Sequence, residues 1–234
     1  MTIKQIREQR AIEKLNNEIA RVSKLYEYED EARRQGFNLI AGVDEAGRGS
    51  LAGPMLVAAV ILPPNIFIDH LNDSKKLTHK MRDKLYDEII NKAISYSTVC
   101  VEIEQIDREN IYQATLSGMY QAIKTLPIQP DFVLTDAMKV KFDDPIETRS
   151  IIHGDALSAS IAAASIIAKV TRDRMTEIWD LQYPEYGFAH NRGYGTKLHR
   201  EAIYKFGACE LHRRSFEPVK SILSNQITLT ECYK

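Results

Sequence analysis

The chain has 234 residues, of which 44% are hydrophobic and 27% are charged. This length accommodates one sizeable core domain with an appendage, and the composition is that of an ordinary globular protein. The formal net charge is -1, which excludes a uniformly basic nucleic-acid coat. Any electrostatic binding surface must therefore be a local patch that is balanced by acidity elsewhere.

The cysteines and the terminal sequence indicate the compartment. The three cysteines are widely spaced and match no zinc-binding or redox motif. We expect reduced thiols, which fit a cytoplasmic location. The charged N-terminus contains no apolar secretory segment, and the stretch from Ile161 to Ala168 is too short to span a bilayer. The sequence therefore predicts a soluble cytoplasmic protein that binds no membrane, and the lack of a long apolar surface stripe favours a monomer.

The first part of the chain has a helical pattern. From Lys4 to Arg34, basic and acidic side chains alternate and apolar residues recur at roughly helical intervals. This pattern predicts one or two amphipathic helices, which Gly36 can end. Because the apolar stripe is thin, we expect residues 1–36 to form a loosely packed N-terminal helical extension.

The core is expected to begin directly after this extension. Strands are predicted over Leu39–Val43 and over the continuous apolar run Met55–Leu62. A helix is predicted over Thr78–Ala93, with Thr78 as its N-cap. Alternating polarity predicts a third strand over Tyr96–Glu104.

Further along, helices and strands alternate. A helix is predicted over Ile111–Leu126, a short strand over Asp131–Asp136 and a long helix over Ser158–Trp179. Short helices are expected around Leu198–Phe206 and Pro218–Leu223. Three early strands followed by alternating helices and strands predict an α/β protein with a mixed sheet rather than a purely parallel one.

Two adjacent carboxylates, Asp44 and Glu45, follow the first strand and precede the turn Gly47-Arg48-Gly49. Successive side chains of a strand point to opposite faces, so inside a strand one member of the pair would be buried without a partner. By itself the pair is more typical of a solvated turn than of a metal site. Both interpretations stay open at this point.

Two further acids strengthen the metal interpretation. Asp136 ends an apolar strand, and Asp155 precedes the long helix, where an N-cap carboxylate is the simpler alternative. If these acids converged with Asp44 and Glu45, they would repel one another, and a divalent cation would relieve that repulsion. Oxygen ligands with no His or Cys nearby favour Mg²⁺ or Mn²⁺. Such a site suits phosphodiester hydrolysis.

Five separated segments point to one family. They are GVDEAGRGSLAGP (Gly42–Pro54), NDSKKL (Asn72–Leu77), HGDALSASIAAASIIAKVTRD (His153–Asp173), YGFAHNRGYGTKLH (Tyr186–His199) and HRRSF (His212–Phe216). In content and order they resemble the signature segments of bacterial ribonuclease HII, and the resemblance covers roughly residues 37–219. It implies an RNase H-like fold and an enzyme that hydrolyses the RNA strand of RNA–DNA hybrids. It also implies nicking 5′ of ribonucleotides, including single ones embedded in duplex DNA, with 5′-phosphate and 3′-hydroxyl ends.

The resemblance also implies a division of the chain and a catalytic set. Residues 37–180 would form the RNase H-like catalytic core, and residues 181–234 a C-terminal helical region that binds substrate. The catalytic residues would also bind two Mg²⁺ or Mn²⁺ ions; they would be Asp44, Glu45, Asp136 and Asp155.

Substrate contacts are implied in the same way. Gly47, Arg48 and Gly49 would recognise the ribose 2′-hydroxyl, which distinguishes RNA from DNA, and Tyr194 would stack on the deoxyribose beside the junction. Phosphate contacts are expected from four further residues, although a solvated helix face is the simpler interpretation of the last two; they are Ser74, Lys75, Lys169 and Arg172.

The region from Phe188 to Phe216 contains six lysines and arginines against two acids. This surplus predicts a basic patch and salt-dependent binding. His190, His199 and His212 lie within this region. A histidine general acid is one interpretation, and structural hydrogen bonding is the simpler one.

Two positions depart from the family pattern. His153 and Leu157 stand where the family commonly has lysines, so positive charge near Asp155 is reduced.

The related ribonuclease HIII family is one alternative. Its members usually have a lysine where Arg48 stands and a larger N-terminal domain, and both features count against membership of this chain in that family. A non-catalytic nucleic-acid-binding module would be expected to lack a carboxylate, and none is missing.

Overall fold

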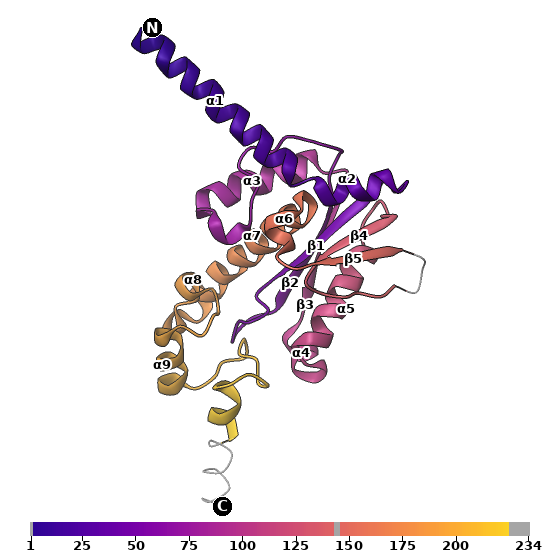
Figure 1. Cartoon of the computed structure of the whole chain (residues 1–234). Helices are drawn as coiled ribbons and strands as arrows, with labels where there is room; N and C mark the ends of the chain where they lie inside the picture. Colours follow the sequence, from indigo (N-terminus) through magenta and orange to yellow (C-terminus); the bar gives the residue numbers. More distant parts are fainter. Residues whose placement is uncertain (1, 143–145, 225–234) are drawn as a thin grey trace, which may run out of the picture.

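The computed structural model describes residues 2–142 and 146–224, which form a central sheet with helices on both faces (Figure 1). The strands lie in the order β3-β2-β1-β4-β5. β2 is antiparallel to β1 and β3, whereas β4 is parallel to β1 and β5. This arrangement confirms the predicted mixed α/β sheet. The strands are β1 (Ile40–Ala46), β2 (Met55–Ile61), β3 (Ser95–Val101), β4 (Phe132–Asp136) and β5 (Glu147–Ile151).

The helices cover both faces of the sheet. α7 packs on β1 and β2 from one face, and α5 covers the same strands from the other. Ahead of the sheet come α1 (Ile3–Lys24) and α2 (Glu27–Arg34), and the core and C-terminal part contain α3 (His79–Lys92), α4 (Ile103–Glu109), α5 (Ile111–Lys124), α6 (Gly154–Leu157), α7 (Ala159–Gln182), α8 (Phe188–Asn191) and α9 (Lys197–Phe206), with 3-10 turns η1 (Ser74–Lys76) and η2 (Pro184–Tyr186). No helix in the described ranges combines the length and apolarity needed to cross a bilayer.

The centre of the sheet is apolar on both faces, as the sequence pattern requires. Ala58 and Val60 of β2 pack on the α7 side, whereas Val57 and Ala59 pack on the α5 side. A strand buried on both faces reads as a continuous apolar run, which is why Met55–Leu62 was recognised as a strand.

β1 approaches the first turn of α7 very closely at Gly42. A Cβ atom at this position would lie 2.1 Å from the backbone carbon of Ser160. The glycine therefore lets the strand and the helix make contact, and this contact fixes the start of α7 beside the strand that contains Asp44.

One or two helices were expected in the N-terminal extension, and it forms two, of which only the first projects from the body (Figure 1). Val22, Tyr26 and Ala32 are buried in the cores of the sheet. The buried carboxylate of Glu29 accepts hydrogen bonds from Ser158 Oγ at 2.7 Å and Ser160 N at 2.9 Å. Loose packing was therefore the wrong expectation for the second half of the extension, because Glu29 binds the N-terminus of α7. The domain limits stay a prediction.

Several element boundaries differ from the expected ones. β1 continues to Ala46, because its antiparallel partner β2 pairs through Asp44 and Glu45. β3 ends at Val101, and α4 begins at Ile103. β5 was not predicted, because four of its five residues are polar or charged and it lacks an apolar alternation. The N-cap of α3 is confirmed, since Thr78 accepts a hydrogen bond from the backbone of Met81.

The C-terminal region packs around a separate apolar cluster. Trp179 of α7 contributes to it together with Tyr186, Phe188 and Ile203. The predicted helix around Leu198–Phe206 is α9, and residues 219–224 are helical as expected.

Candidate active site

Three of the four predicted carboxylates meet at one end of the sheet. Oxygen atoms of Asp44, Asp136 and Asp155 lie within 4.8 Å of one another. The parallel pairing of β1 and β4 brings the first two together, since Val43 is opposite Thr135. β5 ends beside Asp136, and the backbone N–H of Gly154 donates to Asp136 Oδ1 at 2.8 Å, which places the short helix α6 and its Asp155 at the same point.

Strand alternation explains why Glu45 is not a member of this cluster. Asp44 and Asp136 alternate in step with the strand residues that pack on the α7 face of the sheet. Glu45 alternates in step with Ala41 and Val43, which pack on the α5 face. Glu45 instead lies 3.8 Å from the guanidinium of Arg48. Its Oε2 atom is buried and has no hydrogen-bond partner among the described residues. The fourth carboxylate is therefore adjacent to the cluster.

The carboxylates destabilise one another's charged forms. Burial, followed by the charge of Glu45, raises the pKa of Asp44 well above its usual value. Burial is also the largest cause of the raised pKa of Glu45 and of Asp136. A group of buried carboxylates with an unpartnered oxygen fits a divalent cation, which would neutralise the repulsion and occupy the free oxygen. The donor set is all oxygen, which suits Mg²⁺ or Mn²⁺.

The turn η1 contacts this acidic cluster through Lys75. Its Nζ atom lies 2.9 Å from Asp155 Oδ2, and most of its side chain is exposed. Ser74, by contrast, is buried, and its Oγ lies 2.9 Å from Oγ of Ser165, which itself hydrogen-bonds to Asp44. The expected phosphate contact therefore fits Lys75 and does not fit the buried hydroxyl of Ser74.

The Gly47-Arg48-Gly49 loop has a fixed backbone. Gly47 has a φ of +88°, and a Cβ atom there would lie 2.0 Å from Nε of Arg172. The carbonyls of Gly47 and Arg48 accept hydrogen bonds from the guanidinium of Arg213 at 2.7 and 2.9 Å. A Cβ at Gly49 would meet open space. The loop thus presents the half-exposed side chain of Arg48 and an unobstructed Gly49.

Arg172 does not lie on a solvated helix face. It is 1% exposed and donates hydrogen bonds to the backbone carbonyls of Ala52, Pro54 and Arg192. The expectation that it contacts a phosphate is therefore wrong for this structure, because its guanidinium cannot reach solvent. Sequence pattern missed this role, since a helical arginine in a polar stretch indicates an exposed position.

Tyr194 is accessible, as expected. It is 38% exposed, and the ammonium of Lys169 lies 5.9 Å from its ring centroid. Lys169 also pairs with Asp173 at 2.6 Å. Tyr194 and Lys169 therefore form one surface next to the loop that carries Arg48, because Leu51 N donates to the carbonyl of Gly193 at 2.8 Å.

The basic patch is smaller than the sequence count indicated. Arg213 is fully buried, and Arg192 donates to Asp173 O and Thr176 Oγ1. His199 and His212 are also buried and hydrogen-bond to each other, which fits the structural role expected for them. The exposed cations that remain are Lys197, Arg200, Lys205 and Arg214.

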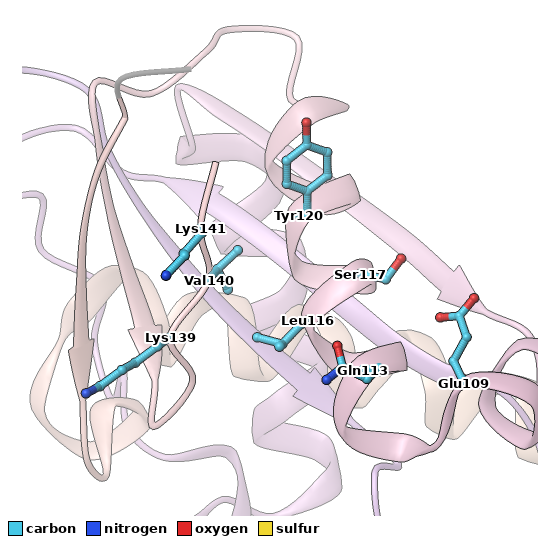
Figure 2. A pocket seen from close by; sticks show the side chains of 8 residues that line it. All are labelled: Glu109, Gln113, Leu116, Ser117, Tyr120, Lys139, Val140 and Lys141. Carbon is cyan, nitrogen blue, oxygen red and sulfur yellow. The ribbon is translucent and has the colours of Figure 1, made fainter. Parts of the chain in front are cut away.

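A cavity of about 660 Å³ lies away from these residues (Figure 2). α5 side chains such as Gln113 and Tyr120 line one side of it, and Lys139, Val140 and Lys141 line the other. None of the four carboxylates lines it, so this cavity is separate from the candidate active site.

Carboxylates at the neighbouring ends of the parallel strands β1 and β4, with a third on the short helix α6 after β5, are typical of metal-dependent nucleases with the RNase H-like fold. Solved structures agree. Ribonuclease H2 from Pyrococcus horikoshii OT3 superposes with a TM-score of 0.67 and 26% identity over 80% of this chain and 97% of that one. Bst-RNase HIII in complex with Mn²⁺ has the same fold, with a TM-score of 0.61 and 18% identity over 83% of this chain and 72% of that one.

Sequence comparisons name the family. The sequence model of ribonuclease HII matches residues 41–219. Ribonuclease HII of Acetivibrio thermocellus is 53% identical over 203 residues, which are 87% of this chain and 79% of the relative. Ribonuclease HII of Coxiella burnetii (strain Dugway 5J108-111) is 54% identical over 184 residues, 79% of this chain and 91% of the relative. The chain belongs to the ribonuclease HII family, and it is a ribonuclease H that acts on RNA–DNA hybrids.

Proposed function

We propose that this ribonuclease H nicks the RNA strand on the 5′ side of a ribonucleotide, including a single ribonucleotide embedded in duplex DNA. Hydrolysis would leave 5′-phosphate and 3′-hydroxyl ends. The observation that carries the proposal is the convergence of Asp44, Asp136 and Asp155 beside the loop that contains Arg48.

The four carboxylates would hold two divalent ions, Mg²⁺ or Mn²⁺. Asp44, Asp136 and Asp155 offer oxygens that lie close enough to share one ion, and the unpartnered Oε2 of Glu45 is available to a second. When bound, such a pair of ions activates a water and stabilises the leaving oxygen of an in-line displacement. The protein's part is to hold the carboxylates rigidly, which the backbone N–H of Gly154 does for Asp136.

Recognition of the ribonucleotide would rest on the Gly47-Arg48-Gly49 loop and on Tyr194. The open space at Gly49 permits close approach of a sugar to the backbone, and the 2′-hydroxyl is the group that marks RNA. The accessible ring of Tyr194 would stack on the neighbouring deoxyribose. Lys75, beside Asp155, and Lys169, beside Tyr194, would contact backbone phosphates. Tyr194 lies in the proposed C-terminal substrate-binding region, and the protein would act as a monomer.

The deciding experiment uses a DNA duplex that contains one ribonucleotide. The protein is incubated with it in Mg²⁺, Mn²⁺ or EDTA, next to an all-DNA duplex and a hybrid with a long RNA stretch. We expect one nick, 5′ of the ribonucleotide, that depends on the metal. Cleavage of the long hybrid without any nick at the single ribonucleotide would refute the finer substrate assignment and leave the family activity intact.

A further inference from the structure

Two buried histidines connect the Tyr194 loop to the C-terminal segment Cys209–Arg213. His199, on α9, is fully buried, and His212 is 1% exposed. Their Nε2 atoms lie 3.1 Å apart, and the rings of Tyr186 and Phe188 pack against them. A pair of imidazoles at this distance requires one donor and one acceptor.

The backbone determines which nitrogen of each ring carries the proton. The N–H of Cys209 can only donate, and its acceptor is Nδ1 of His212, at 3.0 Å. Nδ1 of a neutral His212 is therefore unprotonated, and its proton is on Nε2, which donates to Nε2 of His199. The proton of His199 is then on Nδ1, which donates to the carbonyl of Tyr194 at 2.9 Å. One fixed backbone donor thus sets both tautomers.

Both rings are neutral in this arrangement. Burial lowers the pKa of His199, and burial followed by the charge of His199 lowers the pKa of His212 to about 4. A second proton on either ring would place two N–H groups against each other or against the N–H of Cys209. The chain of hydrogen bonds is therefore satisfied in one direction, from Cys209 to Tyr194.

The same segment also holds the other recognition loop. Arg213 directly follows His212 and donates to the carbonyls of Gly47 and Arg48. An isolated antiparallel bridge pairs Ala52 with His212. The loop with Arg48 and the loop with Tyr194 are thus attached to one buried segment, through a guanidinium on one side and two imidazoles on the other.

We propose that His199 and His212 are positioning residues that set Tyr194 relative to Arg48 and so determine the preference for a single embedded ribonucleotide. This inference rests on the proposed function. Neither ring reaches substrate, so the two histidines act through the carbonyl of Tyr194. Without them, that carbonyl retains its hydrogen bond from Thr196 N but loses its link to Cys209–Arg213.

The first test is independent of activity. Nitrogen-15 NMR of the wild-type protein at neutral pH assigns the protonated nitrogen of each imidazole. We expect Nδ1–H for His199 and Nε2–H for His212. The opposite tautomer on either ring, or a charged ring, overturns the chain of hydrogen bonds from Cys209 to Tyr194.

The second test compares two replacements of His199. His199→Leu removes all hydrogen bonds at similar volume, whereas His199→Asn retains a donor at the position of Nδ1. We expect His199→Leu to lower the preference for the single-ribonucleotide duplex over the long hybrid by about tenfold, through KM, because it weakens one stacking contact. kcat on the long hybrid should change less than about twofold, and His199→Asn should restore most of the preference. The exposed His79, replaced by Asn, is the matched control.

The outcomes separate this inference from the proposed function. If the wild-type protein does not nick the single-ribonucleotide duplex, the proposed function fails. Hydrogen exchange at the backbone amide of Thr196, which donates to the same carbonyl of Tyr194, then tests whether the two histidines position this loop. Faster exchange in His199→Leu than in His199→Asn supports this positioning. An unchanged preference in His199→Leu, or an equal loss in His199→Asn, overturns the positioning role even when the proposed function holds.

Discussion

The ammonium nitrogen of Lys75 lies 2.9 Å from Oδ2 of Asp155, at the edge of a cluster of three buried or half-buried carboxylates. This cation neutralises part of the repulsion among the carboxylates, which a divalent ion would also relieve. A metal that takes Asp155 as a ligand must therefore compete with Lys75 for the same oxygen. Once displaced, the exposed lysine is available to a phosphate of the substrate.

We expect Lys75→Met to bind Mn²⁺ more tightly in the absence of substrate, by about two- to fivefold, because an ion pair with a mostly exposed lysine contributes less than about 1 kcal/mol. The KM for an RNA–DNA hybrid should rise in the same variant. Calorimetric titration with Mn²⁺ measures the first effect. Lys76→Met is the matched control, and equal Mn²⁺ affinity in the two variants would contradict the competition.

Replacement of an acid in the cluster should lower cleavage but raise the stability of the protein. Asp44→Asn or Asp136→Asn should lower cleavage by at least about a thousandfold, in line with losses of other core catalytic groups, while binding of the hybrid survives. The melting temperature of Asp44→Asn in EDTA should rise, because a buried carboxylate with a raised pKa is removed. Cleavage assays and thermal melts check both effects, with the exposed Asp87→Asn as control. Full activity of Asp44→Asn in Mg²⁺ would refute the metal assignment.

The two glycines of the recognition loop should respond differently to alanine. Gly47→Ala places a Cβ at positive φ and 2.0 Å from Arg172, so we expect a loss of about 1–3 kcal/mol of stability and a displaced loop. Gly49→Ala meets open space and should change stability by less than about 0.5 kcal/mol. If substrate approaches Gly49 closely, this second variant loses kcat/KM on the single-ribonucleotide duplex. Urea denaturation and nicking assays test both, and equal stabilities would contradict the packing at Gly47.

Removal of the recognition side chains should alter selectivity more than rate. We expect Arg48→Ala and Tyr194→Ala to reduce the preference for a single embedded ribonucleotide over a long hybrid by about tenfold or more, since each loses a contact made at the junction. Relative kcat/KM on the two substrates measures this. Tyr112→Ala removes an exposed tyrosine from α5 and should leave the ratio unchanged. A uniform loss on both substrates would point to general binding instead.

The buried imidazoles should make stability sensitive to mild acid. The pKa of His212 is about 4 in the folded protein, against 6.5 ordinarily, so the unfolded chain takes up this proton first as the pH falls. The free energy of unfolding should therefore decrease between pH 6.5 and pH 4, by up to about 3 kcal/mol for this residue. His212→Gln does not titrate and should show a flatter curve in urea denaturation. Parallel curves for the two proteins would contradict the lowered pKa.

The family, the sheet type and the identity of the candidate catalytic acids could be predicted from the sequence. Continuous apolar runs such as Met55–Leu62 identify strands that are buried on both faces, and acids at the ends of such runs stand out because burial of an unpaired charge is costly. The five family segments pointed to the activity, which the comparisons then confirmed.

The positions of the carboxylates and arginines depended on contacts between distant parts of the chain. The pairing of β1 with β4 brought Asp44 and Asp136 together, and the hydrogen bond from Gly154 to Asp136 placed Asp155 beside them. The alternation of β1 left Glu45 adjacent to this cluster rather than within it. Arg172 and Arg213 looked like surface cations, but both are buried and hold backbone carbonyls of the loops. Residue type and local pattern establish which groups can do chemistry. Which of them face one another, and which are buried, was decided only when strands and loops far apart in sequence packed together.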